Sequence, residues 1–146
     1  KCHGDKIITK EILEEDINKY GKPMVDKVIE IIEYFKPKYW WIENPKTGKM
    51  KYYISEKYPQ YDIYYDIDYC KYSDWGYQKR TRIWTNIKEF DPKICKVHCH
   101  RMGMDKINKK RKKHITDCSS VGGGSNRLFR YRVPEKLIEE LLLCIV

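Results

Sequence analysis

The sequence predicts an α/β fold, and three patterns lead to that prediction. Apolar residues between positions 23 and 35 recur at helical spacing, and an aromatic run at 39–43 follows them directly. The segment 61–70 alternates apolar and acidic side chains, as a half-buried strand does. A last apolar helix is expected after Pro134. A chain of 146 residues is about one domain's worth, so we expect a single core.

Two helices are expected in the first 36 residues. A weakly amphipathic helix over 11–19 should stop at Tyr20-Gly21. A stronger helix begins with Pro23, where a missing N–H costs little, and ends at Lys36-Pro37. Its core-facing stripe is expected to comprise Met24, Val25, Val28, Ile29, Ile32 and Phe35.

The run at 39–43 reads as a strand buried on both faces, with Glu43 and Asn44 at its carboxyl end. Ligands of open α/β sheets bind beside such ends. After a turn at 46–49, a short helix over 50–57 is expected. The segments 61–70 and 81–87 then predict an antiparallel pair of strands with a long connection.

Composition narrows the class of partner. A net charge of +9 favours an anionic partner, most often nucleic acid, with an acidic membrane surface as the alternative. No apolar run approaches the ~20 residues that span a bilayer, and no signal peptide is visible, so we expect a cytosolic or nuclear protein without a membrane partner. Six cysteines without framework spacing indicate thiols or metal ligands. The chain starts with Lys1 instead of methionine, and we expect it to be part of a longer protein.

Three short stretches, taken together, resemble a known family. They are Ile42-Glu43-Asn44-Pro45, Asp68-Tyr69-Cys70-Lys71-Tyr72, and Gln78-Lys79-Arg80-Thr81-Arg82 leading into Ile83-Trp84-Thr85-Asn86. This combination resembles the DNA cytosine-5 methyltransferases, and most of all their compact phage and large-virus branch. The resemblance implies the C-terminal part of the catalytic domain, with a partial Rossmann-like sheet whose first cofactor-binding strands are absent.

In that family a cysteine thiolate adds to carbon 6 of a flipped cytosine, and carbon 5 then takes the methyl group of S-adenosylmethionine. The resemblance implies that Glu43 holds N3 and the exocyclic amine. Asn44 is expected to hold the turn, as asparagine before proline often does. The resemblance also implies that Arg80 contacts the flipped base, and that Arg82 or Gln78 supports the backbone nearby. We therefore expect the glutamate and these arginines to share one pocket. The alternatives are a strand-end carboxylate without a role and an exposed basic strand.

Cys2 is the nucleophile that the resemblance implies. The stretch Lys1-Cys2-His3-Gly4 keeps the cysteine and glycine of the family's turn but has lysine where the family has proline. The alternative is an incidental terminal cysteine. A glycine-rich strand-turn-helix for S-adenosylmethionine is absent, so that site is expected before Lys1 or on a complementary N-terminal chain, unless the protein is inactive.

The stretch from 91 to 126 reads as a basic insertion in the place of a target-recognition region. Lys109, Lys110 and Arg111 are expected to contact phosphates, which gives affinity without base specificity. A zinc site is one interpretation of its cysteines and histidines, and reduced loop cysteines are the other. The ligand set chosen for zinc is Cys95, Cys99, His114 and Cys118, with His98 or His100 as substitutes.

These inferences divide the chain into three parts. Residues 1–90 are expected to form the C-terminal half of a methyltransferase domain, 91–126 the insertion, and 127–146 a closing helix. The predicted function is transfer of a methyl group from S-adenosylmethionine to a flipped cytosine of double-stranded DNA, by a partial chain or one half of a split enzyme. The alternatives are a non-catalytic, zinc-stabilised DNA-binding module and a small zinc-stabilised protein that binds nucleic acid.

Overall fold

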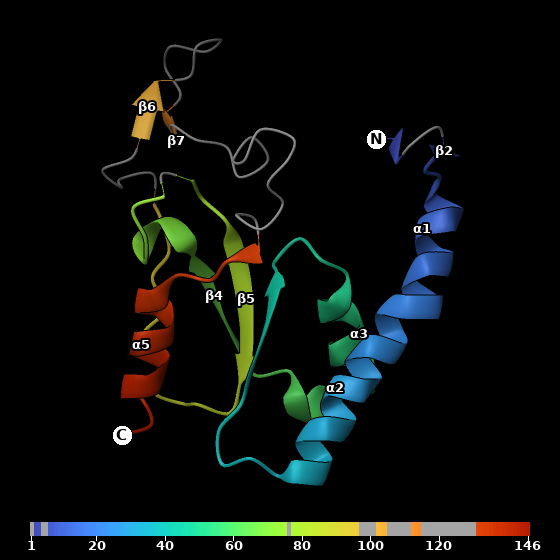
Figure 1. The fold of residues 1–146 in the computed structure, drawn as a ribbon, viewed down its shortest axis with the longest axis horizontal. Helices are drawn as coiled ribbons and strands as arrows, with labels where there is room; N and C mark the ends of the chain where they lie inside the picture. The colour runs from blue at the N-terminus through green and yellow to red at the C-terminus, as the bar shows by residue number, and fades with distance from the viewer. Residues whose placement is uncertain (1, 4–5, 76, 97–101, 105–111, 115–130) are drawn as a thin grey trace.

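A three-stranded antiparallel sheet forms the centre of the structure, a computed structural model that describes residues 2–3, 6–75, 77–96, 102–104, 112–114 and 131–146 (Figure 1). The strands are β3 (Trp41–Pro45), β4 (Tyr64–Asp68) and β5 (Arg80–Thr85), in the order β3-β5-β4. Both outer strands run antiparallel to β5. The expected pair of strands within 61–87 is therefore confirmed, although each strand is shorter than its apolar pattern.

Helices cover both faces of this sheet. On one face, Ile67 and Ile83 pack against Leu137 and Leu141 of helix α5 (Glu135–Leu143), and all four side chains are buried. These leucines are four residues apart and therefore lie on one side of the helix. Figure 1 shows α5 on the side of the sheet opposite to α2 and α3.

The other face is covered by helices α2 (Lys22–Phe35) and α3 (Met50–Lys57). Trp84 of β5 is buried there against Val25 and Ile29 of α2 and Ile54 of α3. Helices on two sides of a sheet confirm the α/β class. The parallel, Rossmann-like arrangement is not what the described strands adopt, because all of their pairings are antiparallel.

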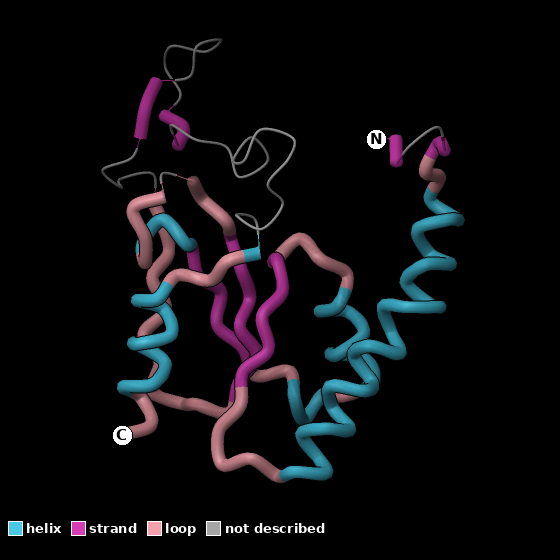
Figure 2. Tube along the Cα trace, viewed as in Figure 1, coloured by secondary structure: helices cyan, strands magenta, loops and turns pink. Residues whose placement is uncertain are grey.

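A continuous helical rod precedes the sheet (Figure 2). Helix α1 (Lys10–Asp16) passes into a π-helical turn at Ile17–Gly21, and α2 follows without a break. The predicted stop at Tyr20-Gly21 is thus wrong, because the wider turn keeps the backbone helical. The predicted end is confirmed: Lys36 adopts a left-handed conformation with φ 46° and donates its N–H to the carbonyl of Ile32 at 2.9 Å.

The predicted apolar stripe of α2 is only partly buried. Val25 and Ile29 lie in the core, whereas Met24 is 67% exposed and Phe35 is 72% exposed. A sheet of three strands is narrow, so only the middle of a 14-residue helix reaches it. The strand around Glu43 differs from its prediction for a related reason. As an edge strand of this sheet, β3 is half-buried along Trp41 to Asn44 instead of buried on both faces.

Two short antiparallel pairs complete the described residues. The first joins β1 (Cys2–His3) to β2 (Lys6–Ile7), and Figure 1 draws it at the far end of α1 from the sheet. The second joins β6 (Met102–Met104) to β7 (Lys112–His114). None of the helices in the described part of the chain is both long and apolar enough to cross a membrane.

Candidate active site

Glu43 lies in the middle of β3, where it is paired with Ile83 of β5. Its Oε1 accepts a hydrogen bond from the hydroxyl of Tyr69 at 3.1 Å and forms an ion pair with Lys79 Nζ at 3.2 Å. Burial and the neighbouring charge of Glu43 raise the pKa of Tyr69, so its hydroxyl stays protonated and acts as the donor. The side chain of Glu43 remains 28% exposed, which leaves the carboxylate within reach of a ligand.

The two arginines of β5 are each held by an aspartate of β4. Arg80 donates through Nε and Nη2 to Asp68, at 2.9 and 2.7 Å. Arg82 donates in the same forked way to Asp66, at 2.8 and 3.1 Å. Forked contacts of this kind fix the plane of the guanidinium as well as its position.

The two pairs differ in their exposure. The side chain of Arg80 is 39% exposed, and its contact with Asp68 uses one edge of the guanidinium and leaves Nη1 on the other. Arg82 is 10% exposed, and its Cζ lies 3.5 Å from the ring centroid of Tyr64. Arg80 is therefore the arginine that can reach a ligand, whereas Arg82 is enclosed between Asp66 and Tyr64.

Hydrogen bonding shifts the pKa values of both aspartates downward. Burial alone would raise the pKa of Asp66, but hydrogen bonds and charge from Arg82 and Lys46 outweigh it. For Asp68, the same opposing burial is outweighed by Arg80, by the backbone N–H of Cys95 and by Gln78. Both aspartates are therefore ionised at neutral pH.

The sheet places Glu43 and the two arginines on opposite faces. Glu43 is opposite Ile83, and Asn44 is opposite Arg82. Successive side chains of a strand alternate between faces, so Glu43 shares a face with Ile83, while Arg80 and Arg82 occupy the other. The expectation that the carboxylate and both arginines point into one pocket is therefore wrong for this sheet.

Lys79 is the residue that links Glu43 to the end of the sheet where Arg80 lies. A cavity of about 410 Å³ there is lined by Pro45, Thr47, Gln78, Lys79 and Arg80. Lys79 contacts the carboxylate of Glu43 as well, so one side chain joins that carboxylate to the cavity. Gln78, which was predicted to act together with Arg80 and Arg82, is an exposed residue just before β5 and lines this cavity.

Asn44 lies at the turn that follows β3, and its predicted role of holding that turn stays a prediction. The turn closes with a hydrogen bond from Gly48 N–H to the carbonyl of Pro45 at 2.8 Å. A Cβ built on Gly48 would overlap Oδ1 of Asn44 and lie 3.0 Å from the carbonyl oxygen of Pro45. The side chain of Asn44 therefore fills the space that the glycine leaves open.

Several predicted site residues are not brought to this cavity. The backbone of Cys2 lies in β1, which Figure 1 draws away from the sheet, and its role as nucleophile stays a prediction. Lys109, Lys110 and Arg111, the predicted phosphate contacts, lie outside the described residues. Of the predicted zinc ligands, Cys99 and Cys118 also lie outside them.

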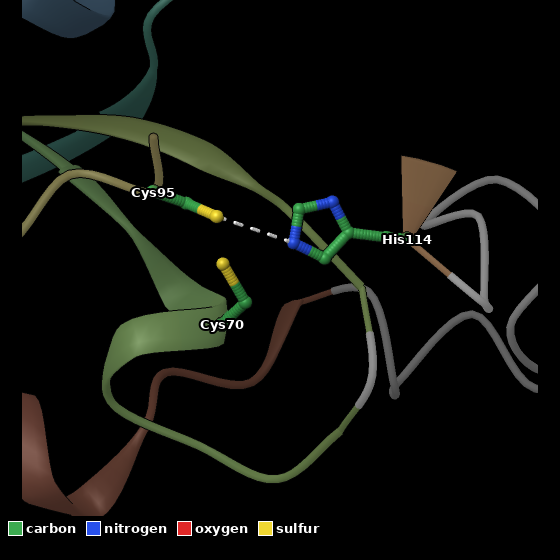
Figure 3. Close-up of side chains that lie close together, drawn as sticks. All are labelled: Cys70, Cys95 and His114. Atoms are coloured by element: carbon green, nitrogen blue, oxygen red, sulfur yellow. Dashed lines mark hydrogen bonds between the residues drawn. The ribbon is translucent and has the colours of Figure 1, made fainter. Parts of the chain in front are cut away.

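The other two predicted zinc ligands come together with a cysteine that the sequence did not indicate. Donor atoms of Cys70, Cys95 and His114 all lie within 4.8 Å of one another, and Figure 3 shows the three side chains converging. The distance from Cys95 Sγ to His114 Nε2 is 3.6 Å. Burial lowers the pKa of His114, which keeps the imidazole neutral.

Sequence reasoning missed the groups that hold the predicted residues. Asp66 and Asp68 alternate with the same period as Arg80 and Arg82, so matching the two charged strands would have indicated these pairs. Lys79 stands inside the arginine motif, and its contact with Glu43 depends on strand register. Cys70 belongs to no spacing motif with Cys95, and only the fold brings the two together.

Comparison with known proteins finds a relative in Frog virus 3. The chain is 46% identical over 143 residues to the "Probable DNA (cytosine-5)-methyltransferase" of Frog virus 3 (isolate Goorha). The match covers 94% of this chain and 64% of the length of the relative. No family model matches the chain, and no solved structure matches it. The resemblance inferred from the sequence is confirmed by this similarity.

Proposed function

We propose that this chain, a relative of a probable viral DNA (cytosine-5)-methyltransferase, supplies the part of such an enzyme that holds the extruded cytosine. One observation carries the proposal: β3, with Glu43, pairs along its length with β5, with Arg80 and Arg82. Two motifs that are distant in the sequence thus become neighbouring strands. The 46% identity over 143 residues and the net charge of +9 support the same activity and a double-stranded DNA substrate.

The cavity at the end of the sheet is the proposed site of the cytosine ring. Its volume of about 410 Å³ lies within the ordinary range of ligand pockets, ~300–1,000 Å³. Cations and an amide line it, and these groups suit the carbonyl oxygen of a pyrimidine and the adjoining phosphate. In this proposal the DNA backbone crosses the strand ends, and the base enters beside Lys79.

Glu43 is the proposed partner of N3 and the exocyclic amine. Oε1 of the carboxylate already receives donors from Tyr69 and Lys79, so this oxygen is placed to accept a donor from a ligand. An incoming exocyclic amine would replace the ammonium of Lys79, which would then turn toward the cavity and a phosphate. This exchange keeps the carboxylate hydrogen-bonded throughout and avoids a buried unpaired charge.

Arg80 is the proposed contact to the base. Asp68 holds one edge of its guanidinium, and the exposed edge with Nη1 is directed to a ligand. Such a preorganised donor stabilises negative charge that develops on O2 when a nucleophile adds to the ring. Arg82 acts as a positioning residue, because it is almost fully enclosed by Asp66 and Tyr64.

The described residues do not fit S-adenosylmethionine, which this family uses as methyl donor. The turn from β3 into α3 contains Gly48, but the side chain of Asn44 fills the space beside it. The described strands also pair only in antiparallel fashion, unlike a dinucleotide-type site. We propose that the methyl donor binds outside the described residues, in another part of the protein or on a complementary N-terminal chain.

Two further roles remain proposals from the resemblance. Cys2 is the proposed nucleophile, since a thiolate is the group that adds to carbon 6. Lys109, Lys110 and Arg111 are the proposed phosphate contacts of the insertion.

Methyl transfer to DNA tests the proposal. The protein containing this chain, supplied with S-adenosylmethionine and duplex DNA, is expected to form 5-methylcytosine, measured by mass spectrometry of hydrolysed DNA. Glu43→Gln and Arg80→Ala should each lower the rate at least ~100-fold, as expected for loss of a group that stabilises the transition state. Glu56→Gln and Lys88→Ala are matched controls at exposed positions and should leave the rate unchanged.

The non-catalytic DNA-binding module gives a different result. It would bind duplex DNA with the steep salt dependence of a basic protein and would form no methylated base. Full activity in both Glu43→Gln and Arg80→Ala would overturn the assigned roles.

A further inference from the structure

Three donor atoms from three separate segments meet beside the carboxyl end of β4. Cys70 lies in the 3-10 turn that follows β4, Cys95 in the segment after β5, and His114 at the end of β7 (Figure 3). The cysteines are buried, at 3% and 6% exposure, and form no disulfide. The two cysteines pack together as a small buried cluster, and His114 brings an imidazole nitrogen to the same point.

We propose that Cys70, Cys95 and His114 bind a zinc ion. Two thiolates and one imidazole are a ligand set that zinc favours, with water or one more side chain in the fourth position. Zinc–sulfur bonds of ~2.3 Å and zinc–nitrogen bonds of ~2.0–2.1 Å at tetrahedral angles separate sulfur from nitrogen by about 3.6 Å. The separation of Cys95 Sγ and His114 Nε2 is 3.6 Å, and all three donors fall within 4.8 Å.

Charge balance supports the same ion. Zinc binding releases the protons of both thiols, and the two thiolates neutralise the dication in a site where an uncompensated charge would be costly. Asp68, whose carboxylate accepts the N–H of Cys95, is already neutralised by its forked pair with Arg80. The cluster therefore gains no excess charge when zinc enters.

The site connects the insertion to the arginine strand. His114 belongs to the β6–β7 pair, so a zinc ion would fasten that pair to the end of β4. The N–H of Cys95 donates to Asp68 Oδ2 at 2.8 Å, and the same oxygen accepts from Arg80 Nη2 at 2.7 Å. Ordering of Cys95 by zinc thus holds the aspartate that positions Arg80.

A hydrogen bond between the Cys95 thiol and His114 is the competing explanation. It accounts for the 3.6 Å contact, but it needs no second thiol, whereas Cys70 is buried at the same point. The two explanations differ in metal content. This makes the test independent of methyl transfer, and failure of either proposal leaves the other standing.

The test is the zinc content of the full chain purified with zinc present and then dialysed. The expected ratio is about one zinc per chain, falling to near zero in Cys70→Ser, Cys95→Ser and His114→Ala. Cys144→Ser is the matched control, because this thiol follows the end of α5 and its hydrogen bonds go to the carbonyls of Glu89 and Glu140, away from the three-donor cluster. Full zinc content in the three ligand variants, or none in the original protein, would overturn the proposal.

A second measurement covers variants that fail to fold. X-ray absorption at the zinc edge of the unaltered protein should give sulfur neighbours at ~2.3 Å together with the multiple scattering of an imidazole. Substitution with Co²⁺ should give a thiolate-to-cobalt charge-transfer band in the near ultraviolet. A zinc shell of oxygen and nitrogen alone, without sulfur, would contradict the ligand assignment.

Discussion

The ion pair between Arg82 and Asp66 should contribute measurably to stability because the sheet encloses it. The two side chains are 10% and 15% exposed, and two hydrogen bonds of 2.8 and 3.1 Å join them. Replacing Asp66 with Asn removes the charge but keeps the shape. It leaves the guanidinium of Arg82 facing a neutral amide inside a nearly closed site.

The expected loss is about 2–3 kcal/mol in the free energy of unfolding. Breaking a fully buried pair costs ~3–5 kcal/mol, whereas an exposed pair contributes ~0–1 kcal/mol. The small remaining exposure of Asp66 and Arg82 places this pair below the first range and above the second. The second cation on Asp66, Lys46 at 2.7 Å, loses its partner as well but is 38% exposed and can turn to water.

Urea denaturation of a double-mutant cycle measures this contribution. Asp66→Asn and Arg82→Met should each lower the midpoint, and the double variant should lose clearly less than the sum of the two. The control pair is Lys27 and Glu30 on α2, whose side chains are 63% and 66% exposed. Its coupling should stay below ~0.5 kcal/mol. Additive losses at Asp66 and Arg82, within the same margin, would refute the view that the sheet locks Arg82.

Three smaller predictions follow from neighbouring contacts. The folded-state pKa of Asp66 lies below its ordinary value, so the stabilisation from its carboxylate is complete above the unfolded pKa and is lost as pH falls. The decrease in unfolding free energy between ~pH 5 and ~pH 2 should therefore be shallower in Asp66→Asn than in the original protein. Parallel curves for the two proteins would contradict this. Gly48→Ala should cost ~1–3 kcal/mol, because the new Cβ displaces Oδ1 of Asn44 and also lies 3.0 Å from the backbone carbonyl oxygen of Pro45, which cannot turn away. Thermal unfolding measures this loss, and an unchanged midpoint would mean that the turn adapts freely. Tyr69→Phe removes a hydrogen-bond donor to Glu43 and should lower the methyl-transfer rate while leaving the free energy of unfolding nearly unchanged. Rate and denaturation measurements on the same variant test this. A large loss of unfolding free energy alongside the loss of rate would make Tyr69 structural only.

The sequence was sufficient to predict elements whose signals are local. Helix α2 follows from Pro23, the recurring apolar residues and the stop at Lys36-Pro37, and β4 and β5 follow from alternation. The π-helical turn at Ile17–Gly21 was missed, because a widened turn leaves no pattern of its own and glycine favours a stop.

The arrangement of the candidate site could not be predicted from the sequence, because it depends on the register between β3 and β5. Alternation determines which residues of one strand share a face, but the pairing of β3 with β5 decides which faces coincide. A shift of one residue in that register would bring Glu43 to the side of Arg82, and the observed register places it opposite Ile83. Cys70 escaped prediction for the same kind of reason, since only the return of the chain brings it to Cys95 and His114.

The central claim is that Glu43 and Arg80 hold a cytosine under nucleophilic attack, and covalent trapping tests it most directly. Duplex DNA with 5-fluorocytosine, offered with S-adenosylmethionine to the protein containing this chain, is expected to give a stable protein–DNA adduct, because fluorine at carbon 5 prevents the final elimination. Glu43→Gln or Arg80→Ala should abolish the adduct, and Glu56→Gln should preserve it. An adduct of unchanged yield in both site variants, or none with the unaltered protein, would contradict the account.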